Sequence, residues 1–232
     1  MRGVEQNITG IGALADPVRR ELYLFVCAQP GPVSRDQAAA AVGIAHHKAK
    51  FHLDRLESEG LLEAVYARLT GRTGPGAGRS SKLYRRAARE FAVSLPTREY
   101  LLAGRLMADA IAESARTGAP VMEVLHRVAA AHGASMGGAA LAAEGRPATP
   151  QAALDLAAAA LAEHGYEPRH EGARTIMANC PFHALAEAQR ELVCHMNHAL
   201  ITGLVERLAP PKVAARLEPG DNRCCVSLAL EG

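Results

Sequence analysis

Apolar side chains recur every three or four residues through most of this chain, a spacing that predicts a mainly helical protein. Between residues 45 and 59, Ala49, Leu53 and Leu56 fall on one face of such a helix, and Gly60 supplies its end. The opposite face carries histidine, lysine and arginine side chains. A polar and basic helix surface of this kind suits the major groove of DNA.

A shorter helix is predicted just before it, over residues 38–42. Ser34 and Gln37 have the spacing of a capping box, in which each side chain satisfies a backbone donor at the helix start. Gly43 has the backbone freedom that a tight turn between the two helices needs. The sequence LLEAVYARL then alternates as a strand does. Residues 34–86 therefore have the order of elements of a winged helix-turn-helix.

The segment after this strand is rich in glycine and strongly basic, as expected of a wing that approaches DNA phosphates. It contains no acidic residue and seven basic ones: Arg68, Arg72, Arg79, Lys82, Arg85, Arg86 and Arg89. A solvated loop is the alternative, but the two-helix pattern before it favours the wing.

The segments ADPVRRELYLFV, FHLDRLESEGLLE and GAGRSSKLYRR resemble the winged-helix domain of ArsR/DeoR-like bacterial regulators, over about the first 90 residues. The resemblance implies a homodimer whose second motif helix enters the major groove. It places Phe51 and Leu53 on the packed side of that helix. The residues implied to face DNA are Ala45, His46, His47, Lys48, Lys50 and His52, with Arg72, Arg79 and Lys82 in the wing.

Charge divides the chain into two parts. Residues 1–90 hold 14 Lys and Arg against 9 Asp and Glu, a net of +5, whereas the remainder holds 12 against 15, a net of −3. This asymmetry fits a DNA-binding domain joined to a domain with another task. We expect a DNA-binding domain at 1–92, a linker or dimerisation helix at 93–118 and an α+β sensor domain at 119–232.

The N-terminus lacks the long apolar run of a signal peptide, and no stretch is apolar enough for a transmembrane span. We therefore expect a cytoplasmic protein without a membrane partner. In that compartment its five cysteines are better suited to metal binding, redox chemistry or a buried core than to disulfides. Cys27, among apolar neighbours, is interpreted as a core thiol.

The sequence REYLLAGRLMADAIAESA predicts a helix directly after the DNA-binding domain. Its Leu101, Leu102, Leu106 and Ile111 suggest a dimer interface, with a buried helix of the sensor domain as the alternative. Farther on, a helix with apolar residues at regular spacing is flanked by short alternating segments on both sides. The fold class expected is mainly α with α+β, ending in a small sheet with a helix packed on it.

Four cysteines lie in this last region: Cys180, Cys194, Cys224 and Cys225. Their wide spacing differs from the close pairs of zinc ribbons, so the fold would have to gather them. Cys224 and Cys225 are adjacent in a predicted strand, so their side chains are expected to point to opposite faces and only one of them should reach a common site. A fourth ligand would then come from His183, His195, His198, a carboxylate or an outside molecule, and buried apolar thiols are the alternative.

The segment NCPFHALAEAQRELVCHMNHALITGLVERL, with the late CC, resembles the sensor region of SufR-type iron–sulfur repressors and, more distantly, the vinyl-4-reductase-like domain. The resemblance implies a [4Fe–4S] cluster on Cys180, Cys194 and either Cys224 or Cys225, whose loss changes operator affinity. The cyanobacterial pattern has a further cysteine between the second and the last, which this chain lacks. A noncysteine ligand such as His183 would then be needed.

Two other readings stay open at this point. Three thiolates with His183 or His198 would suit a structural zinc ion, and an apolar pocket in the sensor domain could bind a small organic effector. An enzyme is not expected, because no nucleophile–base spacing, phosphate loop or paired acid set stands out. We expect a homodimeric repressor of a palindromic operator, with activation as the alternative; the operator sequence and target genes are left open.

Overall fold

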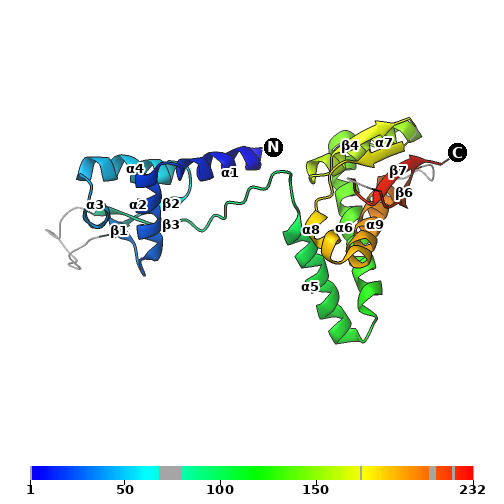
Figure 1. Ribbon diagram of the computed structural model, residues 1–232, viewed down its shortest axis with the longest axis horizontal. Coiled ribbons are helices and arrows are strands. Elements are labelled where there is room, and N and C mark those ends of the chain that lie inside the picture. Colours follow the sequence, from blue (N-terminus) through cyan, green and yellow to red (C-terminus); the bar gives the residue numbers. More distant parts are fainter. Residues whose placement is uncertain (1, 68–79, 173, 209–212, 221–222, 232) are drawn as a thin grey trace. The chain divides into compact units, whose positions relative to one another are not determined.

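The computed structural model describes the whole chain except residues 1, 68–79, 173, 209–212, 221–222 and 232 (Figure 1). The chain divides into two compact units, a first unit at residues 1–93 and a second unit at residues 94–232. The mainly helical architecture with small antiparallel sheets confirms the expected fold class. None of the described helices is both long and apolar enough to cross a membrane.

The first unit combines helices with a small antiparallel sheet in the strand order β1-β3-β2. Its helices are α1 (Arg2–Ala13), α2 (Pro17–Ala28), α3 (Arg35–Val42) and α4 (His46–Ser58). Its strands are β1 (Val33–Ser34), β2 (Leu62–Ala67) and β3 (Ser81–Arg86). Helices α3 and α4 with the β2–β3 pair give the helix-turn-helix followed by a hairpin that the sequence predicts. Arg72 and Arg79 lie outside the described residues.

Local signals set the helix boundaries of the first unit. The capping box at α3 is present, with Gln37 N donating to Ser34 Oγ at 3.2 Å and Ser34 N donating to Gln37 Oε1 at 2.9 Å. Gly43 ends α3 in the left-handed region at φ +69°, where a side chain would be strained. Asp16 caps α2 by accepting from Arg19 N at 3.0 Å.

Helix α1 was not predicted from the sequence, although Val4, Ile8 and Ile11 recur at helical spacing. It packs on the chain that leaves β3: a side chain at Gly10 would collide with the Phe91 ring. Asn7 Nδ2 donates to Ala92 O at 2.9 Å, and Arg89 Nη2 donates to Asn7 Oδ1 at 3.1 Å. These tertiary contacts fix where the helix packs.

The second unit packs helices against an antiparallel sheet in the strand order β4-β5-β7-β6. Its helices are α5 (Tyr100–Thr117), α6 (Val121–Glu144), α7 (Pro150–Glu163), α8 (His183–Ala188) and α9 (Arg190–Leu208). Its strands are β4 (Pro168–Glu171), β5 (Arg174–Met177), β6 (Val213–Leu217) and β7 (Val226–Leu230). Helix α5, expected as a linker at 93–118, is grouped with this unit, because its Ala103, Leu106 and Ala110 are buried in the core of this unit.

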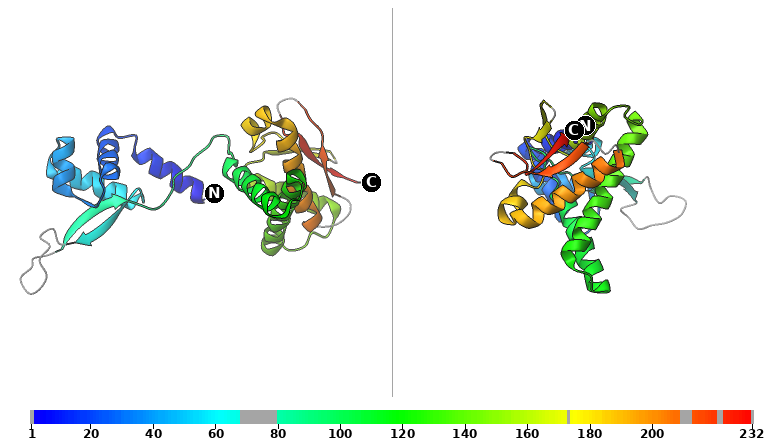
Figure 2. Two further views of the ribbon diagram at one scale, coloured as in Figure 1. Left: turned by 90° about the horizontal axis from the view of Figure 1, so that it is seen from below. Right: turned by 90° about the vertical axis from the view of Figure 1, so that its right-hand side faces the viewer.

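Helices α6 and α9 meet backbone to backbone in the centre of the second unit, where the orange α9 crosses the green α6 (Figure 2). A side chain at Gly133 would collide with the carbonyl group of Leu200, and one at Gly203 with the carbonyl group of Ala130. Only glycine permits so close an approach. This contact fixes the position of α9, which carries Cys194 near its start.

Candidate functional site

The solvent face of α4 is the candidate DNA interface. Ala49, Leu53 and Leu56 are fully buried beneath the helix, as the apolar spacing predicts. The predicted DNA-facing side chains of the opposite side are exposed, and these are His46, His47, Lys48 and Lys50, together with Arg55 and the N-cap residue Ala45. The helix therefore has one packed face and one basic face free in its own unit.

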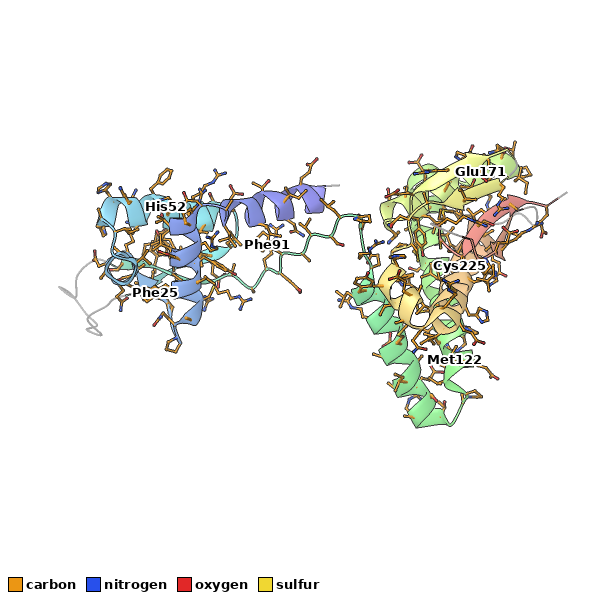
Figure 3. The ribbon with its side chains drawn as sticks, in the orientation of Figure 1. Phe25, His52, Phe91, Met122, Glu171 and Cys225 are labelled. Atoms are coloured by element: carbon orange, nitrogen blue, oxygen red, sulfur yellow. The ribbon has the colours of Figure 1, made fainter. Side chains whose placement is uncertain are left out.

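Two residues of α4 differ from the sequence-based expectation. Phe51 does not lie on the packed side: its side chain is 67% exposed. It is two residues away from both Ala49 and Leu53, and two residues correspond to about 200° around an α-helix, so it points away from them. His52, expected to face DNA, is half-buried on α4, and its Nδ1 atom is buried with no hydrogen-bond partner among the described residues (Figure 3).

The wing strand β3 is tied to α4 by a cluster of charges. Lys82 Nζ donates to Asp54 Oδ1 at 3.0 Å and to Glu57 Oε2 at 2.5 Å. Tyr84, fully buried, donates its hydroxyl to Asp54 Oδ1 at 2.6 Å and accepts from Arg35 Nε at 3.1 Å. Burial opposes the charge of Lys82, but the bonds to Glu57 and Asp54 outweigh it and raise its pKa. Lys82, predicted to contact DNA, thus uses its charge to hold the helix and the strand together.

The second candidate site is a cavity of about 430 Å³ in the second unit, which we call the cysteine cavity. Its walls include all four cysteines of this unit, and Figure 3 labels Cys225. The polar part of its lining is Arg98, Asn179, His183, Glu187, Arg190 and Arg223. The fold therefore gathers the widely spaced cysteines, as the sequence reading required.

Both cysteines of the late pair line the cavity, so the expectation that only one could reach it is wrong. That expectation assumed a strand, in which neighbouring side chains alternate between faces. β7 begins only at Val226, and Cys224 and Cys225 lie in the bend before it. Cys180 comes from the loop after β5, and Cys194 comes from α9.

The thiols form a hydrogen-bonded row in the order Cys180, Cys224, Cys225 and Cys194. Cys180 is hydrogen-bonded to Cys224, and this bond together with burial raises the pKa of Cys180. Cys194 is hydrogen-bonded to Cys225: the bond and burial raise the pKa of Cys225 to about 12, while the same bond lowers that of Cys194. Cys194 is therefore the thiol that ionises most readily on its side of the cavity. Over the part of the chain that the structure describes, no set of three or more His, Cys, Asp or Glu side chains stands ready to hold a metal ion.

Of the three histidines considered as a further ligand, only His183 lines the cysteine cavity. Its Nε2 lies 3.3 Å from Glu187 Oε1, on the next turn of α8. His198 Nε2 is bonded to Ala215 O at 3.1 Å, and the ring of His195 stacks edge-on against His126. These two histidines are engaged elsewhere in the fold.

A buried chain of hydrogen bonds reaches the sulfur of Cys224. Tyr166 donates its hydroxyl to Asn197 Oδ1 at 2.5 Å, and Asn197 Nδ2 donates to Cys224 Sγ at 3.2 Å. Tyr166 and Asn197 are almost fully buried. The sequence analysis missed both, because a tyrosine and an asparagine 31 residues apart carry no joint signal.

Arg98 ties the Cys180 loop to the beginning of α5. Its Nη1 donates to Asn179 Oδ1 at 2.6 Å and to Cys180 O at 2.8 Å. Asn179 Nδ2 donates in turn to Gly165 O at 2.6 Å, and Glu99 N donates to Pro181 O at 3.1 Å. The loop that carries the first cavity cysteine is thus bonded to the residues that follow the boundary between the two units.

The fifth cysteine is remote from the cavity. Cys27 lies on α2 of the first unit and is half-buried, hydrogen-bonded to Tyr23. The expectation of a core thiol holds only in part, because its neighbour Leu24 is 59% exposed.

Searches of curated proteins and of solved structures find no match for this chain. A protein-family model described as a helix-turn-helix domain matches residues 14–65, which span α2, α3 and α4. The match covers the part of the first unit in which the exposed basic helix lies. Residues 14–65 are similar to the helix-turn-helix family, which supports a DNA-binding regulator.

Proposed function

We propose that this protein is a homodimeric transcription repressor that binds a palindromic operator and senses through an iron–sulfur cluster in the cysteine cavity. One observation carries the proposal: a helix-turn-helix with an exposed basic face and a cavity lined by four cysteines occur in one chain. The first supports DNA binding, and the second supplies soft sulfur ligands.

The lining of the cavity fits a cluster in two respects. Four thiols can supply the complete ligand set of a [4Fe–4S] cluster, so His183 is not required. The cluster with its thiolates is anionic, and Arg98, Arg190 and Arg223 surround the same cavity. Arg223 Nη1 is buried and has no partner among the described residues, as expected of a donor whose acceptor belongs to the cavity content.

Binding requires the hydrogen bonds between the thiols to open. Each of the four thiols would have to lose its proton to become a ligand. When bound, the cluster supplies a centre that oxidants can convert or remove. Asn197 keeps its donor on Cys224 Sγ, and hydrogen bonds to ligand sulfur are one means by which proteins tune such centres.

Helix α5 offers a dimer interface. Five of its exposed residues, all apolar or small, follow one another at alternating spacings of three and four, as in a coiled-coil seam: Leu101, Gly104, Ala108, Ile111 and Ala115. Leu101 is 65% and Ile111 is 61% exposed. Leu106, which the sequence suggested for this interface, packs instead into the core of its own unit.

The Arg98 bonds give the proposed signal a physical route. Displacement of the Cys180 loop removes the acceptors of Arg98 and Glu99 at the start of α5. Because α5 is also the proposed dimer helix, its position affects how two first units meet one operator. Arg98 is in this scheme a positioning residue.

The test begins with iron, zinc and acid-labile sulfide analysis of protein purified without oxygen. Equal iron and sulfide are expected, and Cys180→Ser should abolish them, whereas the matched control Cys27→Ser should not. A protein that contains only zinc would have a structural metal site in place of the proposed cluster. If the protein contains no metal and cannot be reconstituted, the binding of a small organic effector would remain as the explanation of the cavity.

The DNA part is tested separately. Duplexes selected from a random pool by the full-length protein should converge on a palindrome, and their affinity should change when iron is removed. A selection without enrichment would contradict DNA binding. An operator of unchanged affinity with and without iron would contradict only the sensing step.

A further inference from the structure

The side chain of Phe51 points outward from α4. The centre of the packed face lies between Ala49, Leu53 and Leu56, and Phe51 is on the opposite side of the helix. Its ring is 67% exposed although α4 is otherwise polar on this side. An aromatic ring exposed on such a face offers a large apolar area to a binding partner, and aromatic side chains contribute much of the energy of interfaces.

The surroundings of Phe51 indicate the chemistry of that molecule. A groove of about 330 Å³ on this face is lined by His47, Lys50, Phe51, Asp54, Arg55 and Ser58. Asp54 is occupied by Tyr84 and Lys82. Lys50 Nζ lies 3.5 Å from Asp54 Oδ2 and Arg55 Nη2 lies 2.6 Å from Glu59 Oε1, but both cationic side chains stay about half exposed beside the aromatic ring, the hydroxyl and the imidazole. They suit an anionic partner that carries an apolar spot.

The ring is also held in one orientation. The imidazole of His52 meets it edge-on, with ring centroids 5.3 Å apart and planes at 72°. His52 is half-buried and therefore a stable support. A side chain that is both exposed and supported can present its edge to a partner with little loss of conformational entropy.

Together these features identify a base contact. In the major groove, thymine is the base that presents a methyl group, and phenylalanine is among the side chains that contact it. The cationic groups beside Phe51 suit the flanking phosphates. We infer that Phe51 is a specificity-determining residue that packs on the 5-methyl group of a thymine in the operator, an inference that rests on the proposed DNA binding.

The experiment removes the methyl group from the DNA and the ring from the protein. After an operator has been selected with the full-length protein, each of its thymines is replaced in turn by uracil, which lacks only the methyl group. At one position per half-site, affinity should fall about four-fold, which corresponds to the burial of one methyl-sized group. The affinity of Phe51→Ala should not depend on uracil at that position.

Two variants serve as controls. Phe51→Leu keeps an apolar side chain and should retain part of the sensitivity to uracil. Leu24→Ala removes a similarly exposed apolar side chain of the first unit outside α4. This variant should keep the full sensitivity to uracil. Because Phe51 is exposed, its replacement leaves the core intact, which circular dichroism can check.

The outcomes separate the two ideas. A selected operator on which no uracil substitution matters, or on which Phe51→Ala keeps the same sensitivity, would overturn the thymine contact while leaving DNA binding in place. Loss of dimerisation in Phe51→Ala would assign the ring to a protein interface and overturn the inference as well. A wild-type protein that selects no duplex would overturn both the inference and the proposed function.

Discussion

The candidate DNA interface and the cysteine cavity are fixed by opposite kinds of interaction. Helix α4 is tied to β3 by charged groups, with Lys82 between Asp54 and Glu57. At the cavity, the bonds that reach the sulfur of Cys224 come from the buried, neutral side chains of Tyr166 and Asn197. Ion pairs near a surface respond to pH and salt, whereas a buried neutral network responds to the loss of a partner atom. The two sites should therefore respond to different perturbations.

The largest expected effect tests whether the two units are independent. Gly133→Ala places a methyl group against the Leu200 carbonyl group and should lower the free energy of unfolding of the second unit by about 3 kcal/mol, the upper end for an overpacked core. Urea denaturation should show the transition of the first unit unchanged.

A matched control lies on the same helix. At Gly138 the nearest atom to an added methyl group is Arg207 Nε at 3.7 Å, so Gly138→Ala should not destabilise. Because alanine has the higher helix propensity, equal losses for Gly133→Ala and Gly138→Ala could not come from propensity and would show that the close contact of α6 with α9 at Gly133 does not govern the result.

A smaller effect is expected in the first unit. Tyr84→Phe removes the hydroxyl that donates to Asp54 and accepts from Arg35, and should cost about 1–3 kcal/mol of unfolding free energy. Tyr66→Phe, at an exposed tyrosine of the neighbouring strand, is the control. Unchanged stability of Tyr84→Phe would show that the charge cluster does not hold α4 in place.

The charge cluster around Asp54 also predicts that the stability of the first unit, which contains the whole cluster, depends on pH. Burial opposes ionisation of Asp54, but the bonds from Tyr84 and Lys82 outweigh it and lower its pKa below 3.8. A lowered folded-state pKa gives stability that is complete above the unfolded pKa and disappears as the pH falls through the folded one. Below about pH 4, the midpoint of urea denaturation of the first unit should therefore decrease as the pH falls. In Asp54→Asn this decrease should be smaller.

The smallest effect concerns the connection between the two regions. In Arg98→Ala protein that retains iron and sulfide, the ratio of operator affinities with and without iron should fall by about five-fold, a typical coupling energy. Arg105→Ala, at an exposed arginine of α5, should leave that ratio unchanged. A ratio unaffected by Arg98→Ala would remove Arg98 from the route.

Local signals explain what the sequence could predict. The capping box at Ser34, the turn at Gly43 and the apolar spacing of α4 act within a few residues, and the structure has all three. The opposite is true of α1, whose place depends on Phe91 at the far end of the unit. Phe51 was misplaced because a family pattern was followed, although the spacing from Leu53 indicates the solvent side.

At the cavity, sequence gave the residue types but not the arrangement. The gathering of four cysteines depends on the loop after β5, on α9 and on the bend before β7, which no local spacing encodes. The exclusion of one member of the Cys224–Cys225 pair failed because the strand starts one residue later. Arg98 was missed because its partners lie about 80 residues away.

The contact of α6 with α9 also bears on how stiff the second unit is. With glycine at 133 and 203, no side chain separates the two backbones, so neither helix can slide along the other without a collision. Cys194 belongs to α9, and a shift of its sulfur that moves the helix must move α6 with it. Close-packed interiors have low compressibility, so a displacement of α9 at the cavity should be felt by α6, a helix of 24 residues.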